Sequence, residues 1–488
     1  QTGNTITTTG ATWSVYNLDV EAGGSAVLGT TNLDHYGTSL VNNSSFTIGT
    51  GAITFRNSGA VSVSGSGTYD LYDVTANNAD VTLNSNLMSV RRTLEMTNGG
   101  TFNANNSGNP NRNLVLASSA TGTGRLGPVS AGPSFLGQIR MERFVPAGIT
   151  NWRLISAPTN GNALSSLEDD FVTAGYPGSE FPLFDQPVGS NILWPSIRTY
   201  DEPNAGPALI DGLTGATGDN MVMAAGQGFA AWSGTTLLGT SAFTIDLRST
   251  PRLGLAPISL PVTYTTNGFP ATDGWNLVGN PVPSPIDFTL VSKTNVDDFY
   301  YVFGPVAGNN ASWDEGLGVS IPALSLNGNI QSFQGFWVKA NAAAPTMSVE
   351  EGDKVLDLNG GGLFGGSEQG PQPMFRVELS SGINAFFDET LIHFGTGAPA
   401  SGDAHDLVKF TFSHPDAPQI MSRTADGADM TLNAWGPITT ATEIPVAIDV
   451  AITGDYTLRI FDAMGLMGQT CLVLEDLFTG QSIALSEG

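Results

Sequence analysis

The segment Trp152-Arg-Leu154-Ile-Ser-Ala-Pro158 returns later in the chain as Trp275-Asn-Leu277-Val-Gly-Asn-Pro281. The segment Gly226-Gln227-Gly228-Phe229 returns in the same order as Phe333-Gln334-Gly335-Phe336. The first segment of each copy reads as a strand that ends at a proline, because proline cannot donate to a sheet ladder. The second segment opens an aromatic strand. The middle of the chain therefore contains a duplicated unit, and its strands are typical of an all-β fold.

The duplication predicts two tandem β-sandwich repeats, at residues 138–256 and 257–358. Trp152, Phe229, Trp275 and Phe336 stand at matched places in the two copies, which favours a role as repeat core. A sugar-stacking platform is the alternative. It is disfavoured because a decayed repeat seldom keeps a binding site in both copies.

The region before the duplication, residues 1–137, consists of short segments in which apolar and polar residues alternate, with Asn, Gly and Ser between them. Examples are Ala52-Ile-Thr-Phe55, Ala60-Val-Ser-Val63 and Asp80-Val-Thr-Leu83. A period of two indicates strands with one buried face. The close spacing favours an N-terminal parallel β-solenoid, with an antiparallel sandwich as the alternative. The likeness of the segment from Tyr16 to that from Tyr72 supports a repeat.

After the duplication, residues 359–373 form a Gly-rich linker by composition. Alternating segments then follow at 374–379, 390–394, 443–448, 456–461 and 472–474. Their spacing predicts a C-terminal β-sandwich over 374–488. With 488 residues, a solenoid and several sandwich domains fit the length.

The charge of the chain limits its partners. The 44 acidic and 18 basic residues leave a formal net charge of −26, which repels nucleic acid and anionic lipid. Nucleic acid is therefore excluded as a main partner. Carboxylate pairs suit Ca²⁺, and the candidate ligands are Asp297, Asp298, Asp314 and Glu315. Solvated surface charge is the favoured alternative, because no pair lies in an EF-hand pattern.

The single cysteine, Cys471, excludes an internal disulfide, and its apolar neighbours predict a buried thiol. No stretch of 18 apolar residues occurs, so we expect no membrane insertion. The chain opens at Gln1 without methionine, as a secreted chain does after removal of its signal peptide, although a trimmed chain would look the same.

Motifs of catalysis are nearly absent from the sequence. Gly122-Thr-Gly124-Arg-Leu-Gly127 matches the dinucleotide fingerprint, but Pro128 and Pro133 follow and prevent a helix, so it reads as a turn. There is no nucleophile elbow, Walker loop or Cys/His metal pattern. Paired carboxylates for glycoside cleavage stay open. A polysaccharide lyase is disfavoured, because the region 1–137 has no lysine and only scattered arginines: Arg56, Arg91, Arg92, Arg112 and Arg125.

The run Arg140-Met-Glu-Arg143-Phe-Val-Pro146-Ala-Gly148, followed by the duplicated segments, resembles large secreted and surface proteins of Bacteroidota that leave the cell through the type IX secretion system. The segments 456–461 and 474–480 are similar to the sandwich that commonly precedes the sorting domain in such proteins. Members of this kind are adhesins, matrix proteins or gliding-associated proteins. The resemblance implies a mature chain whose sorting domain has been removed.

We therefore expect a secreted or cell-surface protein with a structural or adhesive function that self-assembles into a filament, sheet or surface layer through β-edges and domain faces. The expected partners are further copies of the chain, as a homo-oligomer or homopolymer. We expect no enzymatic activity and no cofactor, apart from Ca²⁺ as a candidate ion. The alternative is a secreted protein that binds or degrades polysaccharide, with a surface glycan as its partner. A passive spacer is a third hypothesis.

Overall fold

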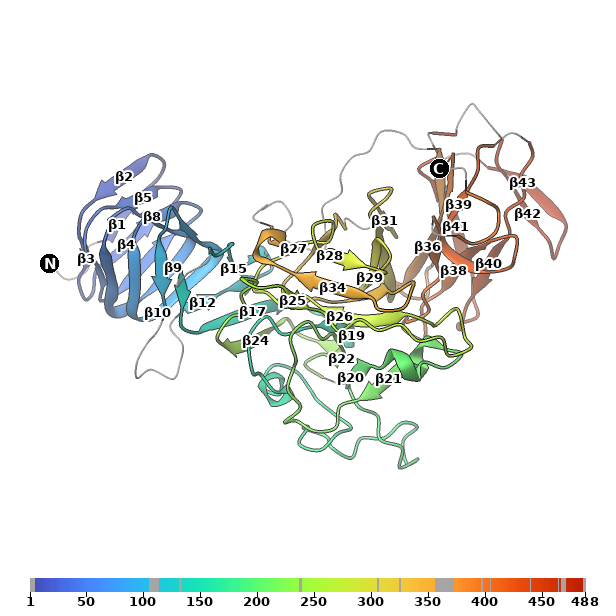
Figure 1. Cartoon of the computed structure of the whole chain (residues 1–488), viewed down its shortest axis with the longest axis horizontal. Coiled ribbons are helices and arrows are strands. Elements are labelled where there is room, and N and C mark those ends of the chain that lie inside the picture. Colours follow the sequence, from blue (N-terminus) through green and yellow to red (C-terminus); the bar gives the residue numbers. More distant parts are fainter. Residues whose placement is uncertain are drawn as a thin grey trace.

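The computed structural model describes residues 5–104, 114–130, 134–236, 239–304, 307–323, 326–355, 373–395, 398–403, 405–438, 440–463, 465–466 and 471–485, without the side chains of Ser85 and Asn86. The chain is all-β, and its N-terminal part is a parallel β-solenoid of about five turns, as predicted. The solenoid lies at one end of the molecule, the duplicated region in the middle and the C-terminal sheet at the other end (Figure 1). The predicted linker lies outside the described residues except for Pro373.

The solenoid has three walls of parallel strands. The first wall contains β1 (Thr5–Thr8), β4 (Ser25–Leu28), β7 (Ser45–Ile48), the middle of β9 (Ala60–Asn77) and of β10 (Asp80–Thr97), and β12 (Leu114–Leu116). The second contains β2 (Thr12–Val15), β5 (Asn32–His35), β8 (Ala52–Phe55), the last parts of β9 and β10, and β15 (Arg125–Leu126). The third contains β3 (Leu18–Val20), β6 (Ser39–Asn42), the first parts of β9 and β10, β11 (Thr101–Asn103) and β16 (Phe135–Leu136).

The register of these strands stacks inward side chains into columns. On the first wall Ala26, Phe46, Tyr69, Met88 and Leu114 follow one another from coil to coil, and each is at most 3% exposed. The alternation seen in the sequence therefore supplies one buried residue per coil to each column. The likeness between the segments at Tyr16 and Tyr72 is not structural, however. The Tyr16 ring contacts that of Tyr36 on the next coil, with ring centroids 6.0 Å apart, and Tyr72 occupies a different corner.

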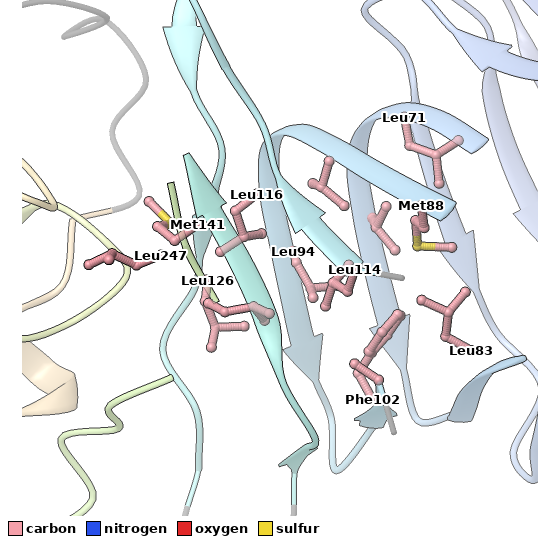
Figure 2. Packing of buried hydrophobic residues seen from close by; sticks show 14 of the residues in the cluster. Leu71, Leu83, Met88, Leu94, Phe102, Leu114, Leu116, Leu126, Met141 and Leu247 are labelled. Carbon is pink, nitrogen blue, oxygen red and sulfur yellow. The ribbon is translucent and has the colours of Figure 1, made fainter. Parts of the chain in front are cut away.

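The solenoid sheet continues into the first repeat. Strand β17 (Ile139–Val145) pairs in parallel with β12 and antiparallel with β24 (Phe243–Ser249). Figure 2 shows the same row of buried side chains passing from Leu116 and Leu126 to Met141 and Leu247. The boundary that we predicted at residue 137 thus falls inside one continuous core.

The two repeats share one topology, as the duplication implies. In the first, β19 (Asn151–Ile155) pairs with β22 (Phe229–Ser233), which pairs with β20 (Ile197–Tyr200) and through it with β21 (Leu213–Gly215). In the second, β26 (Trp275–Gly279) pairs with β33 (Gly335–Lys339), which pairs with β29 (Phe299–Gly304), followed by β30 (Asn309–Asp314) and β31 (Val319–Ile321). The register is also the same, since Ile155 faces Phe229 as Val278 faces Phe336.

Each repeat has a second layer. The pair β17 and β24 packs on the first sheet through Ile245 and Leu247, which join Ile155 and Phe229 in one hydrophobic cluster. A three-stranded sheet of β25 (Ile258–Ser259), β34 (Thr346–Val349) and β28 (Ser292–Thr294) covers the second. The remaining short elements are β13 (Ser118–Ser119), β14 (Gly122–Thr123), β18 (Gly148–Ile149), β23 (Gly239–Thr240), β27 (Ile286–Asp287), β32 (Asn329–Ile330), η1 (Leu164–Leu167), η2 (Glu202–Asn204), η3 (Leu209–Gly212) and η4 (Glu351–Asp353).

The repeats pack on each other through equivalent atoms, as the halves of a twofold dimer do. Ile155 forms a bridge with Gln334, and its counterpart Val278 forms one with Gln227. The Ser156 N–H donates to the carbonyl oxygen of Phe333 at 2.9 Å, and the Gly279 N–H donates to that of Gly226 at 2.8 Å. The repeated Gln-Gly-Phe segment therefore joins the two copies.

The glycine of that segment is required by close approach. A methyl group on Gly228 would lie 2.4 Å from the carbonyl oxygen of Val278, and one on Gly335 would lie 2.9 Å from that of Ile155. Both distances are below van der Waals contact. Because glycine has no side chain, the backbone of each copy can pack directly against the backbone of the other at these two positions.

The C-terminal region forms one sheet in the order β40 (Val446–Asp449), β38 (Gln419–Arg423), β39 (Asp429–Trp435), β36 (Phe387–Phe394), β35 (Met374–Ser381) and β41 (Tyr456–Phe461), with β37 (Leu407–Val408) beside β39 and a separate hairpin of β42 (Val473–Asp476) and β43 (Gln481–Ala484). Phe410 and Phe412 reach from it to Trp275 and Trp152, at ring distances of 4.7 and 5.6 Å.

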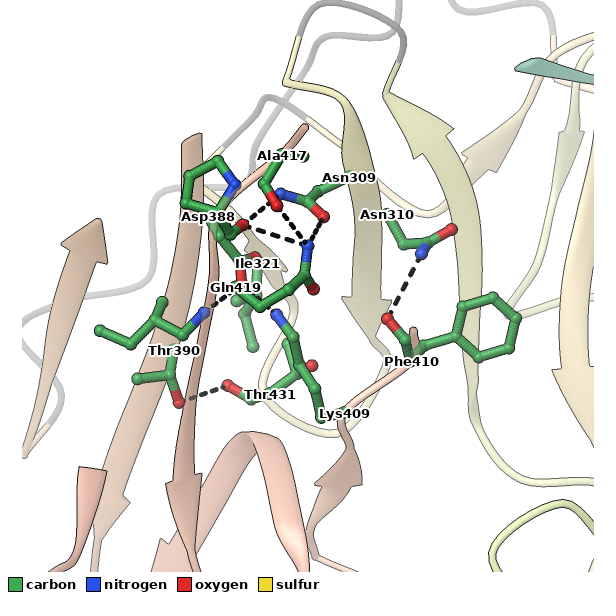
Figure 3. Close-up of polar contacts among 12 residues, drawn as sticks. Asn309, Asn310, Ile321, Asp388, Thr390, Lys409, Phe410, Ala417, Gln419 and Thr431 are labelled. Carbon is green, nitrogen blue, oxygen red and sulfur yellow. Dashed lines mark hydrogen bonds and ion pairs between the residues drawn. The ribbon is translucent and has the colours of Figure 1, made fainter. Parts of the chain in front are cut away.

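Polar side chains add to the contact between this sheet and the second repeat. Figure 3 shows Asn309 beside Gln419, and Asn310 facing the carbonyl group of Phe410. The amide of Asn309 donates to the carbonyl oxygens of Phe387 and Pro418 at 2.9 and 3.0 Å. Because buried amides need such partners, these bonds fix the C-terminal sheet on the repeats.

Candidate functional site

Among the described residues, which begin at Thr5, nothing fully covers the apolar side chains of the first solenoid coil. The column of buried residues on the first wall ends at Ile6, which stacks on Ala26 and is 49% exposed. On the second wall the column ends at Trp13, which stacks on the fully buried Leu33 and is 37% exposed. On the third wall Leu18 stacks on Leu40 and is half-buried. All three side chains would become buried if one more coil were added.

The same coil presents unpaired strand edges. Among the described strands, β1 pairs only with β4, β2 only with β5 and β3 only with β6. The outer side of each strand therefore carries backbone N–H and C=O groups without a strand partner. Such an edge is a template for a strand of another chain. The exposed ring of Tyr16 lies at the corner of this coil.

Two other parts of the surface are strongly apolar. The loop between Phe181 and Leu193 exposes Leu183 at 84% and Val188 at 83%. The hairpin β42–β43 exposes most of its residues, with Phe478 at 97%. Cys471, which we predicted to be buried, is exposed at the base of this hairpin. The prediction was wrong because the neighbouring apolar run faces solvent instead of a second sheet.

An aromatic pocket lies in the first repeat. It has a volume of about 510 Å³ and is lined by Phe184, Trp194 and Trp232, with mostly apolar neighbours. The centroids of Trp194 and Trp232 are 5.8 Å apart, and the Arg198 guanidinium lies 5.2 Å from the Trp194 ring. The volume is in the range of small-molecule sites. No carboxylate is among the described residues that line it.

The four aromatic residues predicted as repeat core lie inside the protein. Phe229, Trp275 and Phe336 are fully buried, and Trp152 is 8% exposed. Trp152 does not line the aromatic pocket but lies behind one of its rings, since the Trp152 ring is 5.7 Å from that of Trp194. The rings that line the pocket come from residues outside the repeated segments or at their ends, which is why the duplication did not reveal them.

The predicted Ca²⁺ ligands lie near one another but are engaged with protein groups. Asp298 and Glu315 both contact the Lys293 ammonium, at 3.2 and 2.6 Å. Asp297 accepts a hydrogen bond from Asn341 at 2.6 Å, and Asp314 accepts one from the Leu317 N–H at 2.7 Å. Burial raises the pKa of Asp314 to about 6. Within the described ranges no group of three or more His, Cys, Asp or Glu side chains is placed to hold a metal ion.

The arginines that we predicted to be scattered are in part gathered. Arg91, Arg92 and Arg125 line one pocket of about 160 Å³, together with Arg143 of β17. The coil length explains the error, because Thr93 stacks directly on Arg125 although 32 positions separate them. Because the last coils differ in length, the spacing of these arginines along the sequence does not show that they lie close together.

Comparisons with known proteins give no indication of function, so a proposal of function depends on the fold and on the sites described above. No family model, no curated protein and no solved structure matches the chain. Among the described residues, no helix is both long enough and apolar enough to cross a membrane.

Proposed function

We propose that the protein is a structural or adhesive component of a cell surface that assembles by stacking a second copy of itself onto the open coil of the solenoid. The single observation that supports this is the termination of the buried columns at Ile6, Trp13 and Leu18 while all three remain solvent-accessible. Solenoids whose end repeats are not polar expose their core in this way and are prone to association.

The energetics favour association once charge repulsion is reduced. Complete burial of a large apolar side chain stabilises a contact by about 1.5–3 kcal/mol, and the unpaired edges of β1, β2 and β3 add backbone hydrogen bonds. The net charge of −26 opposes contact between copies. Added salt or Ca²⁺ screens this repulsion, so we expect assembly to increase with ionic strength.

Sedimentation velocity and electron microscopy of the 1–488 chain, at rising concentration, with and without salt and Ca²⁺, test the proposal. The substitution Ile6→Lys places a charge at the end of the column and should abolish assembly. Val27→Lys is the matched control, because Val27 is an exposed residue on the flank of β4, one coil from the end. A chain that stays monomeric under all conditions, or an Ile6→Lys variant that assembles like the control, would overturn the proposal.

A second candidate function, binding of a glycan without cleavage, is favoured by the aromatic pocket. Aromatic rings accept the apolar face of a sugar, and the lining of Phe184, Trp194 and Trp232 provides three of them. The arginine Arg198 and polar residues such as Gln186 supply hydrogen-bond groups at or beside the pocket.

Glycan-array binding followed by calorimetry tests this candidate. Trp194→Ala should weaken binding of any glycan that is retained by at least tenfold, whereas Phe478→Ala, which removes an exposed ring on the distant hairpin, should leave it unchanged. Equal affinities for the two variants would exclude the pocket as the binding site.

A further inference from the structure

The pocket lined by Arg91, Arg92, Arg125 and Arg143 is a concentration of positive charge in an acidic protein. The chain has only 18 lysine and arginine residues against 44 acidic ones, and four of the 18 line this one pocket. No aspartate or glutamate is among the described residues that line it. The pocket lies where the corner of the last solenoid coils meets the hairpin β13–β14 and the loop of Gln331 and Ser332 from the second repeat.

Two of the arginines are held in place by aspartates of the preceding coil. The Arg91 Nε lies 2.8 Å from Asp70 Oδ1, and the Arg92 Nε donates to Asp73 Oδ1 at 2.7 Å. Both guanidinium groups also lie over the ring of Tyr72, at 5.7 and 4.7 Å from its centroid. The Arg91 Nη2 also donates to the carbonyl oxygens of Ile48 and Gly49. These contacts orient the two side chains at the corner, and because each guanidinium carries five N–H donors, each keeps some for a ligand.

Arg143 differs from them, because no described group compensates its charge. It stands on β17, where its side chain is partly exposed, and it lines the pocket. The structure shows no hydrogen bond or ion pair from its side chain to any described residue, and partial loss of contact with water lowers the pKa of Arg143. Because Arg143 shares this pocket with three other arginines, a bound anion would reduce the repulsion between their positive charges.

We propose that this pocket binds an oxyanion, with Arg143 as the central donor and Arg91, Arg92 and Arg125 around it. Arginine forks match the oxygen pairs of sulfate, phosphate and carboxylate groups. The volume of about 160 Å³ has room for an inorganic oxyanion with several water molecules, or for one charged sugar residue. Hydroxyl groups of the β13–β14 hairpin also line the pocket, among them Ser118 and Thr123, whose oxygens are hydrogen-bonded to each other at 2.6 Å.

Thermal unfolding and calorimetry of the 1–488 chain with sulfate, with phosphate and with chloride at equal ionic strength test this site. We expect sulfate or phosphate to raise the melting temperature above the chloride value. Arg143→Gln should weaken oxyanion binding at least tenfold and, because it removes one of four positive charges that share the pocket, should raise the melting temperature in ligand-free buffer. Arg143→Lys keeps the charge without the fork and should weaken binding by a smaller factor.

Arg56→Gln is the matched control, since Arg56 pairs with Asp34 on the solenoid surface at 2.8 Å and does not line the pocket. It should leave binding unchanged. Parallel titrations with polygalacturonate and chondroitin sulfate distinguish the two sources of the oxyanion. If the ligand is an acidic polysaccharide, these polymers should bind more tightly than the inorganic ion. If the ligand is a free oxyanion, the inorganic ion should bind and the polymers should not. The proposal would be overturned if sulfate, phosphate and chloride gave equal responses. It would also be overturned if the Arg143→Gln variant bound the oxyanion as the wild type does and unfolded at a lower temperature without ligand. Neither result bears on assembly at the open coil.

Discussion

The solenoid and the duplicated centre both repeat a β-unit, but they close their cores in different ways. In the solenoid each coil is related to the next by translation, and the first coil leaves Ile6 and Trp13 exposed. In the centre, the two copies face each other through equivalent atoms, so that Gln227 contacts Val278 as Gln334 contacts Ile155. A translational repeat always has an end layer to cover, whereas a twofold pair covers each copy with the other.

This difference explains why we place assembly at one end of the solenoid and not at the centre. The centre is enclosed further, because Phe410 and Phe412 of the C-terminal sheet pack on Trp275 and Trp152. Within the described part of the chain, the solenoid sheet continues into further strands at its far end, through β17 and β24. Four predictions test how far the contrast holds, from the largest expected effect to the smallest.

We expect the free energy of unfolding to fall by the same amount when either copy of the repeat loses the buried phenylalanine of its Gln-Gly-Phe segment. Phe229→Ala and Phe336→Ala each remove a fully buried side chain from equivalent positions. Each should destabilise the protein by about 3–5 kcal/mol, from lost burial and the cavity left behind. Urea unfolding measures both, and costs that differ by several kcal/mol would show that the copies are not energetically equivalent.

The close approach of the two copies predicts the next effect. Gly228→Ala and Gly335→Ala force a methyl group toward the backbone of the opposite copy and should cost about 1–3 kcal/mol each. Gly148→Ala is the control, because nothing lies within 4 Å of its added methyl group. Thermal unfolding should give lower melting temperatures for Gly228→Ala and Gly335→Ala than for Gly148→Ala. A Gly228→Ala variant as stable as the control would contradict the tight contact between the two copies.

A partly buried carboxyl group in the first repeat should make stability depend on pH. Burial raises the pKa of Asp170 to about 7, against about 3.9 for an unfolded aspartate. Between these values the folded state binds more protons than the unfolded one, so stability falls as pH rises from about 4 to 7. Asp170→Asn should add about 1 kcal/mol at pH 8, after allowance for solvent screening, and little at pH 4.

Denaturant unfolding at the two pH values measures this effect. The Asp246 N–H, which donates to Asp170 at 2.8 Å, keeps an acceptor in the variant. A variant with the same pH dependence as the wild type would show that other carboxyl groups cause it.

The smallest effect is expected at the open coil. Ile6→Ala should change the stability of the dilute chain by less than about 1 kcal/mol, because Ile6 is half exposed. Ile53→Ala, within the second-wall column, should cost about 2–5 kcal/mol. At concentrations where copies associate, the cost of Ile6→Ala should rise, since association would bury it. Equal values above and below that concentration would place the contact elsewhere.

The solenoid could be predicted because its signal is local. Segments such as Ala52-Ile-Thr-Phe55 alternate between buried and outward residues, and β8 has this pattern in the structure. The duplication could also be predicted from the sequence, because Trp152 and Trp275 are followed by similar residues at the same spacing. The arginine pocket could not be predicted in the same way, because Arg92, Arg125 and Arg143 belong to coils of unequal length.

The amino-acid sequence by itself determined the strands, their inward faces and the presence of two copies, because a period of two and a repeated motif are properties of neighbouring residues. Only the tertiary structure decided that the copies pair about a twofold axis, that the first coil leaves Ile6 uncovered and that four arginines meet at one corner. These depend on coil length and on which surfaces meet, and contacts between distant residues leave no pattern along the chain.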